Sequence, residues 1–102
     1  MNSHPYIYIA LRADLPRPQQ SVQASHAAIE ATRKFLDTDL EHPSVIILNM
    51  KTENDLVKFM DKCPYNFIEF REPDMKNQLT AVATEPIFGD DRKFFRKFQL
   101  LK

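Results

Sequence analysis

Two short apolar runs constrain the fold of this chain more than any other feature. They read "YIYIALR" at residues 6–12 and "SVIILNM" at residues 44–50. Continuous runs of β-branched and aromatic residues are typical of strands that are covered on both faces, rather than of strands with one face in water. We therefore expect the first run to be a central strand of its sheet, and the second to be buried in the same way.

A helix is predicted between these two strands, over residues 18–36. The segment "LPRP" breaks the chain after the first strand, and Pro18 suits the first turn of a helix, where its missing N–H costs nothing. Helical spacing aligns several side chains on the expected buried side. These are Val22, His26, Ile29 and Arg33, widened by Ala28, Ala31, Phe35 and Leu36.

A second helix is predicted to start just after Thr52. Thr52 followed by Asp55 resembles a helix capping box, and Pro64 is expected to end the helix. Its expected buried side contains Leu56, Met60 and Cys63.

The remaining segments predict two strands and a closing helix. The strands are "YNFIEF" at residues 65–70 and "QLTAVAT" at residues 78–84, and the short polar link between them predicts a hairpin. The final segment, residues 90–102, predicts an amphipathic helix that buries Phe94, Phe98 and Leu101.

The order of these elements predicts the fold class. Long helical connections imply parallel crossovers, and a short link implies antiparallel pairing. We expect an α/β three-layer sandwich whose mixed four-stranded sheet has three parallel crossovers plus a terminal hairpin, with helices on both faces. The 102 residues are the size of one small domain, so residues 1–102 are expected to form a single domain.

Composition excludes several classes of function. Lysine plus arginine number 14 and aspartate plus glutamate number 14, so any attraction to nucleic acid must come from a local patch. The single Cys63 suits a reducing compartment. The chain has no basic leader, no run of about 20 apolar residues, no zinc-ligand spacing and no glycine-rich phosphate loop. We expect a soluble, cytoplasmic protein with no membrane association, metal or cofactor.

Candidate site residues cluster where the first strand meets the first helix. In open α/β sheets, ligands collect outside the carboxyl ends of the parallel strands. Arg12 and Asp14 follow the first strand, and the start of the helix brings Gln19, Gln20 and Gln23 to the same rim. The sequence thus predicts a polar rim there.

Each remaining candidate also has an ordinary structural interpretation. A histidine such as His26 on an apolar helical stripe is more often a partly buried ring, hydrogen-bonded to a carbonyl or to Gln23. Asp14 is more often a cap or turn former, Glu69 alternates with apolar neighbours and is expected to face water, and Thr80 is an ordinary strand residue.

Four segments together favour a functional interpretation. They are "ALRADLP", "QASHAA", "LTAVATEP" and the terminal "QLLK". The combination resembles the small peptidyl-tRNA hydrolases of the archaeal and eukaryotic class. Those proteins have an Arg-x-Asp-Leu turn, a Gly-Lys-x-x-x-Gln-x-x-His-Ala helix and a late threonine-containing strand. The resemblance covers nearly the whole chain, and its identities are Asp14, Leu15, Gln23, His26, Ala27, Ala28, Thr80 and Pro86.

The resemblance implies hydrolysis of the ester that joins a peptide to the terminal ribose of tRNA. It implies catalytic roles for His26, Asp14, Thr80 and Glu69, with His26 or Glu69 as the general base. It implies substrate binding by Arg12, Arg17, Gln19 and Gln23, with tRNA as the partner and no cofactor.

The chain departs from the family pattern at three places. The family's lysine at the head of the helix is Gln19 here, and the preceding glycine is Pro18. The family's Asp-Ala-Gly segment is absent, and Glu69 is the nearest carboxylate. A Gly-Thr pair has become residues 77–78, which leaves Thr80 as the threonine of the last strand.

These departures keep two alternatives open. One is a catalytically lapsed scaffold that binds RNA or a protein, and the other is a hydrolase of a smaller, uncharged ester. Members of the family often form homodimers, so Phe94, Phe95 and Phe98 are expected either at such an interface or in the core.

Overall fold

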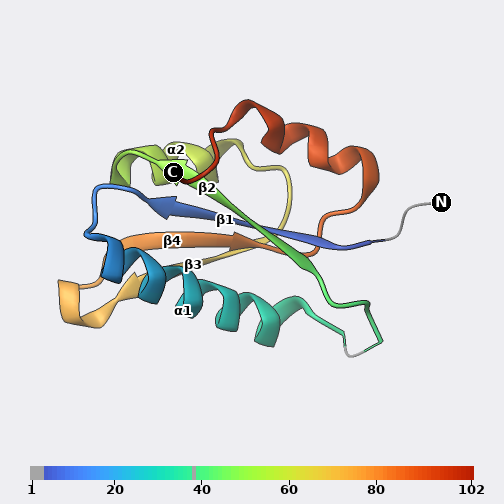
Figure 1. Cartoon of the computed structure of the whole chain (residues 1–102), viewed down its shortest axis with the longest axis horizontal. Helices are drawn as coiled ribbons and strands as arrows, with labels where there is room; N and C mark the ends of the chain where they lie inside the picture. Colours follow the sequence, from blue (N-terminus) through green and yellow to red (C-terminus); the bar gives the residue numbers. More distant parts are fainter. Residues whose placement is uncertain (1–3, 38) are drawn as a thin grey trace.

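The structure, a computed structural model of the chain, describes residues 4–37 and 39–102, so residues 1–3 and 38 lie outside it. Its sheet has four strands in the order β2-β1-β4-β3 (Figure 1). β1 (Tyr6–Arg12) pairs in parallel with β2 (Ser44–Met50) and antiparallel with β4 (Gln78–Thr84). β3 (Phe67–Glu72) is antiparallel to β4 at the other edge. The mixed four-stranded sheet, the central place of β1 and the hairpin of β3 and β4 are confirmed.

Helices cover both faces of this sheet. α1 (Arg17–Phe35) lies on one face, while α2 (Glu53–Lys62) and the 3-10 helix η2 (Gly89–Lys97) lie on the other (Figure 1). Within the described residues, none of the helices combines the length and apolar character needed to cross a membrane.

The connections differ in number from the prediction. α1 joins β1 to β2, which are parallel neighbours. β3 and β1 are both antiparallel to β4, so they run in the same direction, and α2 joins β2 to β3 across the sheet. The topology therefore has two connections between strands of the same direction, rather than the three parallel crossovers predicted.

The buried side of α1 is rotated from the predicted one. Val22 and Ile29 are 45% and 54% exposed, whereas Ala27 and Ala31 are fully buried. The sheet supplies the bulk at this interface, and the helix contributes small residues that let it approach closely. The sheet side chains packed with these alanines are Ile7, Ile9, Leu11, Ala81 and Ala83.

On the opposite face, η2 replaces the predicted amphipathic α-helix. With about three residues per turn, it turns Phe95 into the core, where its ring stacks on Tyr8 with the centroids 3.9 Å apart. Phe94 and Phe98 are partly buried against the same core. These phenylalanines therefore pack within the chain, and the homodimer stays a prediction.

α2 begins as its capping residues predict. The hydroxyl of Thr52 accepts from the backbone N–H of Asp55 at 3.3 Å, and the helix ends at Lys62, before Pro64. Leu56 is fully buried, with Phe59 beside it in the core.

Two strands differ from the prediction because of their neighbours. β2 is an edge strand with Val45 49% exposed, so the prediction that both its faces are buried is wrong. Part of its outer edge is covered, because the backbone N–H of Leu101 donates to Ile47 O at 2.9 Å. β3 begins and ends two residues later than predicted, because Arg71 and Glu72 pair with β4.

The rotation of α1 predicts that substitutions at two nearby positions change the free energy of unfolding by different amounts. Ala27→Leu should lower the free energy of unfolding by about 1–3 kcal/mol, because the added carbons have no space against the sheet. Ile29→Ala should change it by less than about 0.5 kcal/mol, because that side chain already faces solvent. Urea unfolding of both variants measures the difference, and the reverse order of effects would restore the predicted buried side.

Candidate functional site

A β-bulge in β4 directs Thr80 toward α1. Phe70 pairs with Ala81, but the next residue of β3, Arg71, pairs with Leu79, which leaves Thr80 as an extra residue in β4. Ala81 packs in the core beneath α1, and the Thr80 side chain contacts α1 as well. A bulge breaks the alternation of a strand and re-aims a side chain in this way. Thr80 therefore reaches the rim at the start of α1.

The re-aimed hydroxyl belongs to a group of four polar side chains that we call the Gln23 cluster: Gln19, Gln23, Glu72 and Thr80. Thr80 Oγ1 donates to Gln23 Oε1 at 2.6 Å. Gln23 Nε2 donates to Glu72 Oε1 at 2.8 Å and to Gln19 Oε1 at 3.1 Å. Gln23 and Thr80 are fully buried, while Glu72 is half-buried and Gln19 is exposed. A buried hydrogen bond thus supports two groups at the surface.

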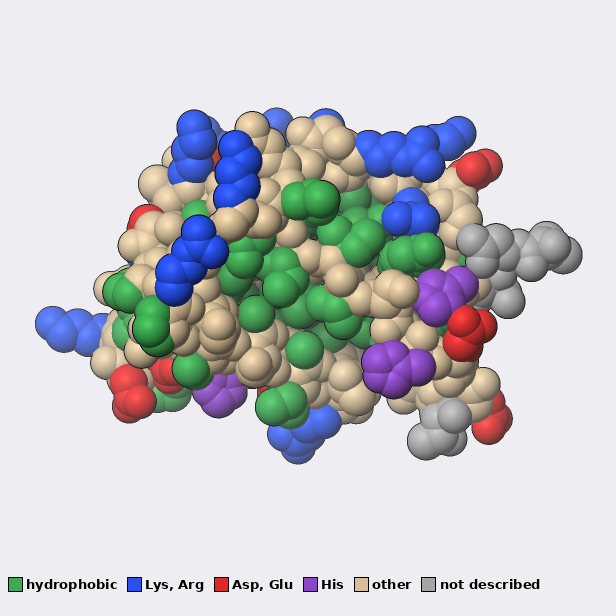
Figure 2. Space-filling model, in the orientation of Figure 1, with side chains coloured by type: hydrophobic (Ala, Val, Ile, Leu, Met, Phe, Trp, Pro, Cys, Tyr) green, Lys and Arg blue, Asp and Glu red, His purple; other side chains and the backbone are tan. Residues whose placement is uncertain are grey.

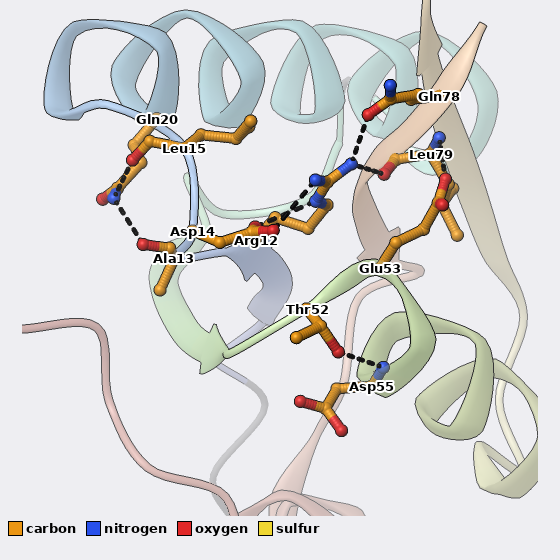
Figure 3. A network of polar contacts seen from close by, with 10 residues as sticks. All are labelled: Arg12, Ala13, Asp14, Leu15, Gln20, Thr52, Glu53, Asp55, Gln78 and Leu79. Atoms are coloured by element: carbon orange, nitrogen blue, oxygen red, sulfur yellow. Dashed lines mark hydrogen bonds and ion pairs between the residues drawn. The ribbon is translucent and has the colours of Figure 1, made fainter.

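A second network lies at the end of β1 (Figure 3). Arg12 Nε and Nη2 donate to the two carboxylate oxygens of Asp14 at 3.0 and 2.9 Å. Its Nη1 donates to Gln78 Oε1 at 2.9 Å and to Leu79 O at 3.2 Å. Arg12 is buried and these bonds engage its guanidinium, so its contacts are structural.

The same pair fixes the charge of Asp14. Its hydrogen bonds from Arg12 lower the pKa of the Asp14 carboxyl, and the carboxylate raises the pKa of Arg12. A general base works best with a pKa near the operating pH. Asp14 is therefore suited to holding the turn and its charge, rather than to accepting a proton.

Further bonds in Figure 3 brace the rim from both sides. Gln20 Nε2 donates to Leu15 O at 2.8 Å and to Ala13 O at 3.2 Å, which fixes the turn between β1 and α1. Glu53, at the start of α2, accepts from the backbone N–H of Leu79 at 2.8 Å. The rim is thus held to α1 and α2.

His26 lies one turn beyond Gln23 on α1. Its ring is half-buried and stacks on Phe70, with the centroids 4.7 Å apart and an interplanar angle of 9°. Within the described part of the chain, its nitrogens form no hydrogen bond. Residues three apart share one side of a helix, so the imidazole lies beside the Gln23 cluster with its nitrogens available.

The structure does not bring Glu69 to this cluster. Its carboxylate accepts from Arg71 Nε at 2.9 Å. It borders a separate depression with Glu30 and Arg33, which lie further along α1 than His26. Arg17 is exposed at the first residue of α1. Of the predicted residues, Gln19, Gln23 and Thr80 are joined by hydrogen bonds, Arg12 and Asp14 form their own pair, and His26 is adjacent on α1.

Glu72 is the site residue that the sequence analysis missed. The predicted strand stopped at Phe70, which assigned Glu72 to a polar link. The sequence signal that could have found it is the two-residue spacing of Phe70 and Glu72, which puts both side chains on one face of a strand. This spacing extends the strand to Glu72, the residue before Pro73. Glu72 caps η1 (Pro73–Met75) and also accepts from Gln23.

The amide, carboxylate, hydroxyl and imidazole groups at this rim are suited to hydrogen bonding and acid–base chemistry. No three His, Cys, Asp or Glu side chains among residues 4–37 and 39–102 converge as a metal site would require. A comparison of the chain with known protein families and with curated proteins finds no match. The function is therefore argued from the rim itself.

The buried hydrogen bond of Thr80 predicts a specific loss of stability. Thr80→Val should lower the free energy of unfolding by about 1–3 kcal/mol, because it removes a partner of the buried Gln23 amide. Thr80→Ser keeps the hydroxyl and is expected to retain more of this stability. Urea unfolding tests the pair, and equal losses in the two variants would contradict a role for the hydroxyl.

The Arg12–Asp14 pair predicts a dependence on pH. The pKa of Asp14 lies below its ordinary 3.8 in the folded chain, so the pair stabilises the fold above that pH and loses this effect as pH falls further. Asp14→Asn should cost about 1 kcal/mol at pH 7, a value limited by the partial exposure of Asp14. The difference from wild type should shrink as pH falls further below 3.8 and Asp14 becomes protonated.

The matched control is Asp90→Asn, because that carboxylate is exposed and lies 3.9 Å from Lys93. Chemical unfolding at several pH values measures both variants. A pH-independent deficit for Asp14→Asn would assign its effect to something other than the ion pair.

Proposed function

We propose that this chain is a peptidyl-tRNA hydrolase-like enzyme that hydrolyses the ester between a peptide and the terminal ribose of tRNA. The observation that carries the proposal is the Gln23 cluster, which lies at the rim of the sheet beside the imidazole of His26, whose nitrogens form no hydrogen bond within the described residues. We also propose that the fold is a three-layer sandwich whose reacting groups lie between α1 and the sheet. The protein is proposed to be cytoplasmic.

His26 is the proposed general base. Stacking on Phe70 holds the plane of the ring, and neither ring nitrogen is engaged within the described residues. An imidazole exchanges protons readily near neutral pH, and general-base assistance is typically worth about 10²- to 10⁴-fold in rate. Glu69 is not proposed for this role, because it lies away from the cluster.

The reaction needs no group beyond water and this base. A water oxygen attacks the carbonyl carbon of the ester, and His26 takes one proton from that water. The tetrahedral intermediate collapses by breaking the bond between the carbonyl carbon and the ribose oxygen. The imidazolium returns its proton to the ribose oxygen, which leaves a peptide acid and tRNA with a free hydroxyl group.

The start of α1 and the Gln23 cluster supply donors and orientation. Gln19 Oε1 accepts from Gln23, which leaves the Gln19 Nε2 group to donate to the substrate carbonyl or to the developing oxyanion. α1 has no side-chain cap at its first turn, so the backbone N–H of Gln19 can do the same, whereas Pro18 has no N–H and that of Gln20 donates to Pro16 O. Glu72 accepts from Gln23 Nε2, and its proposed role is to stabilise a protonated His26 or to orient the water.

One observation favours a second candidate, the catalytically lapsed scaffold. Gln23 and Thr80 are fully buried and satisfy one another. Three depressions in the described surface lie elsewhere, with lining residues from other parts of α1, β3, α2 and the C-terminal segment. We still favour the hydrolase, because the two groups that would act on the ester, His26 and Glu72, are both half-buried rather than sealed.

The deciding experiment is release of a labelled N-blocked aminoacyl group from tRNA by the purified chain. We expect cleavage at neutral pH, with His26→Ala lowering kcat about 10²-fold or more because it removes the base. Glu72→Gln should lower kcat by a smaller factor, because it removes the charge beside His26 but keeps an acceptor for Gln23.

Glu69→Gln is the matched control, since it removes the same charge on the same strand away from the cluster. It should leave the rate within about twofold, because a surface charge distant from the reacting groups contributes little. Cleavage that survives His26→Ala would remove the proposed base. No cleavage by a folded chain that binds tRNA would favour the lapsed scaffold.

A further inference from the structure

A surface depression of about 460 Å³ lies between the end of β2, α2 and the segment after η2. Four lysines line it, and we call it the lysine depression: Lys51, Lys58, Lys62 and Lys97. Asp55 is the only carboxylate in its lining, and the aromatic rings of Phe59 and Phe98 belong to it. The lysine depression therefore combines concentrated positive charge with an apolar surface.

The four lysines of this depression outnumber the single carboxylate in its lining. Among the described residues, none of the four lysines forms a salt bridge. Lys97 lies over the rings of Phe94 and Phe98, with its Nζ at 4.6 and 5.4 Å from their centroids. Figure 2 shows Lys and Arg side chains gathered at the upper left, where Figure 1 draws α2 and the end of β2. The chain as a whole has no net charge, so the excess of four lysines over one carboxylate in this lining is local.

We propose that the lysine depression binds the phosphate backbone of RNA. Its charges come from three segments, so they are spread as a polyanion requires, rather than focused on one small anion. Lys58 and Lys62 are one helical turn apart on α2, about 6 Å along its axis, and can meet successive phosphates. Lysine ammonium groups are flexible point charges, which suits contact with the backbone of RNA without sequence readout.

The aromatic lining favours RNA over an acidic protein. Phe98 is partly exposed beside Lys97, which places a ring surface next to a cation. Bases stack on such rings, and a positively charged groove that tracks the backbone commonly combines with them in proteins that bind single strands. An acidic peptide has carboxylates for the lysines but no such bases.

The lysine depression adjoins the rim that carries the candidate site. Met50 belongs to its lining, and the Met50 carbonyl accepts from the backbone N–H of Ala13 at 2.7 Å, directly beside Arg12 and Asp14. One RNA can therefore occupy the lysine depression and extend over the carboxyl ends of β1 and β2 toward His26. The inference deepens the proposed function and rests on it for the identity of this RNA as tRNA.

Binding of fluorescently labelled tRNA across a range of salt concentrations tests the inference. Lys58→Gln with Lys62→Gln should weaken binding about tenfold or more at low salt. The slope of log K against log salt concentration should fall by about 2, since two phosphate contacts are lost. Lys51→Gln, in the loop before α2, should lower the slope by about 1 and does not depend on the integrity of α2.

The matched control is Lys34→Gln with Lys93→Gln, which removes the same charge from exposed positions outside the depression. It should change affinity less than about twofold, whereas equal losses in both double variants would overturn the assigned site. Unchanged binding in Lys58→Gln with Lys62→Gln would overturn it as well. Poly-glutamate is the second probe, and lysine-dependent binding of poly-glutamate without binding of tRNA would assign the depression to an acidic protein instead.

Hydrolysis assays separate this inference from the proposed function. If lysine-dependent tRNA binding occurs without any hydrolysis, the lysine depression stands and the enzyme proposal fails. If hydrolysis occurs and Lys58→Gln with Lys62→Gln leaves KM for the tRNA substrate unchanged, the enzyme proposal stands and the lysine depression fails. A raised KM in that variant, with His26→Ala still binding tRNA, supports both.

Discussion

The buried hydrogen bond between the Thr80 hydroxyl and the Gln23 amide oxygen is the contact on which the rim depends. Both side chains are fully buried, so water cannot replace either partner. Because the Gln23 amide oxygen accepts from Thr80, the Gln23 amide nitrogen points the other way and needs acceptors of its own. It finds them in Gln19 and Glu72. A single buried amide thereby fixes the positions of two polar groups at the surface, which is what a preorganised site requires.

This arrangement is possible because α1 lies close to the sheet. Ala27 and Ala31 on the helix and Ala81 and Ala83 on β4 are all fully buried, so small residues meet from both sides. A larger residue at any of these positions would lift the helix and lengthen the Thr80–Gln23 bond. The small residues where α1 meets β4 therefore serve the site as well as the packing.

The sequence predicts the elements of this fold better than their orientation. The bounds of β1 and β4 and the cap of α2 follow from local patterns, because composition and hydrogen bonding within a few residues decide them. The buried side of α1 does not follow, since alanine carries little periodic signal and Val22 and Ile29 carry a misleading one. The exposure of β2 depends on its place at the edge of the sheet, which no local pattern encodes.

The candidate site shows the same division. Gln23, His26 and Asp14 are recognisable from one helix and its preceding turn. Glu72 enters the site only through the register of β3 against β4, and Thr80 reaches it only because a bulge reverses its direction. Both depend on pairing between strands, so a single sequence signals them weakly. The sequence pattern favours Glu69 as the carboxylate of the site, but in the folded strand Glu69 lies away from the Gln23 cluster.

Under the proposed function, a chain with no net charge and with Gln19 in place of the family's lysine has to hold an anionic substrate, and the distribution of charge accounts for this. On the rim, Arg12 is paired with Asp14, and Glu72 adds a carboxylate to the Gln23 cluster. The lysines of the lysine depression, which form no salt bridge among the described residues, lie on the side of the sheet that α2 covers. Binding at the lysine depression that stabilises the substrate and the transition state equally lowers KM without raising kcat. It raises the rate of the proposed reaction only if it positions the ester against His26. Under the proposed function, placement of the ester by the braced rim must supply what the family's lysine would otherwise provide.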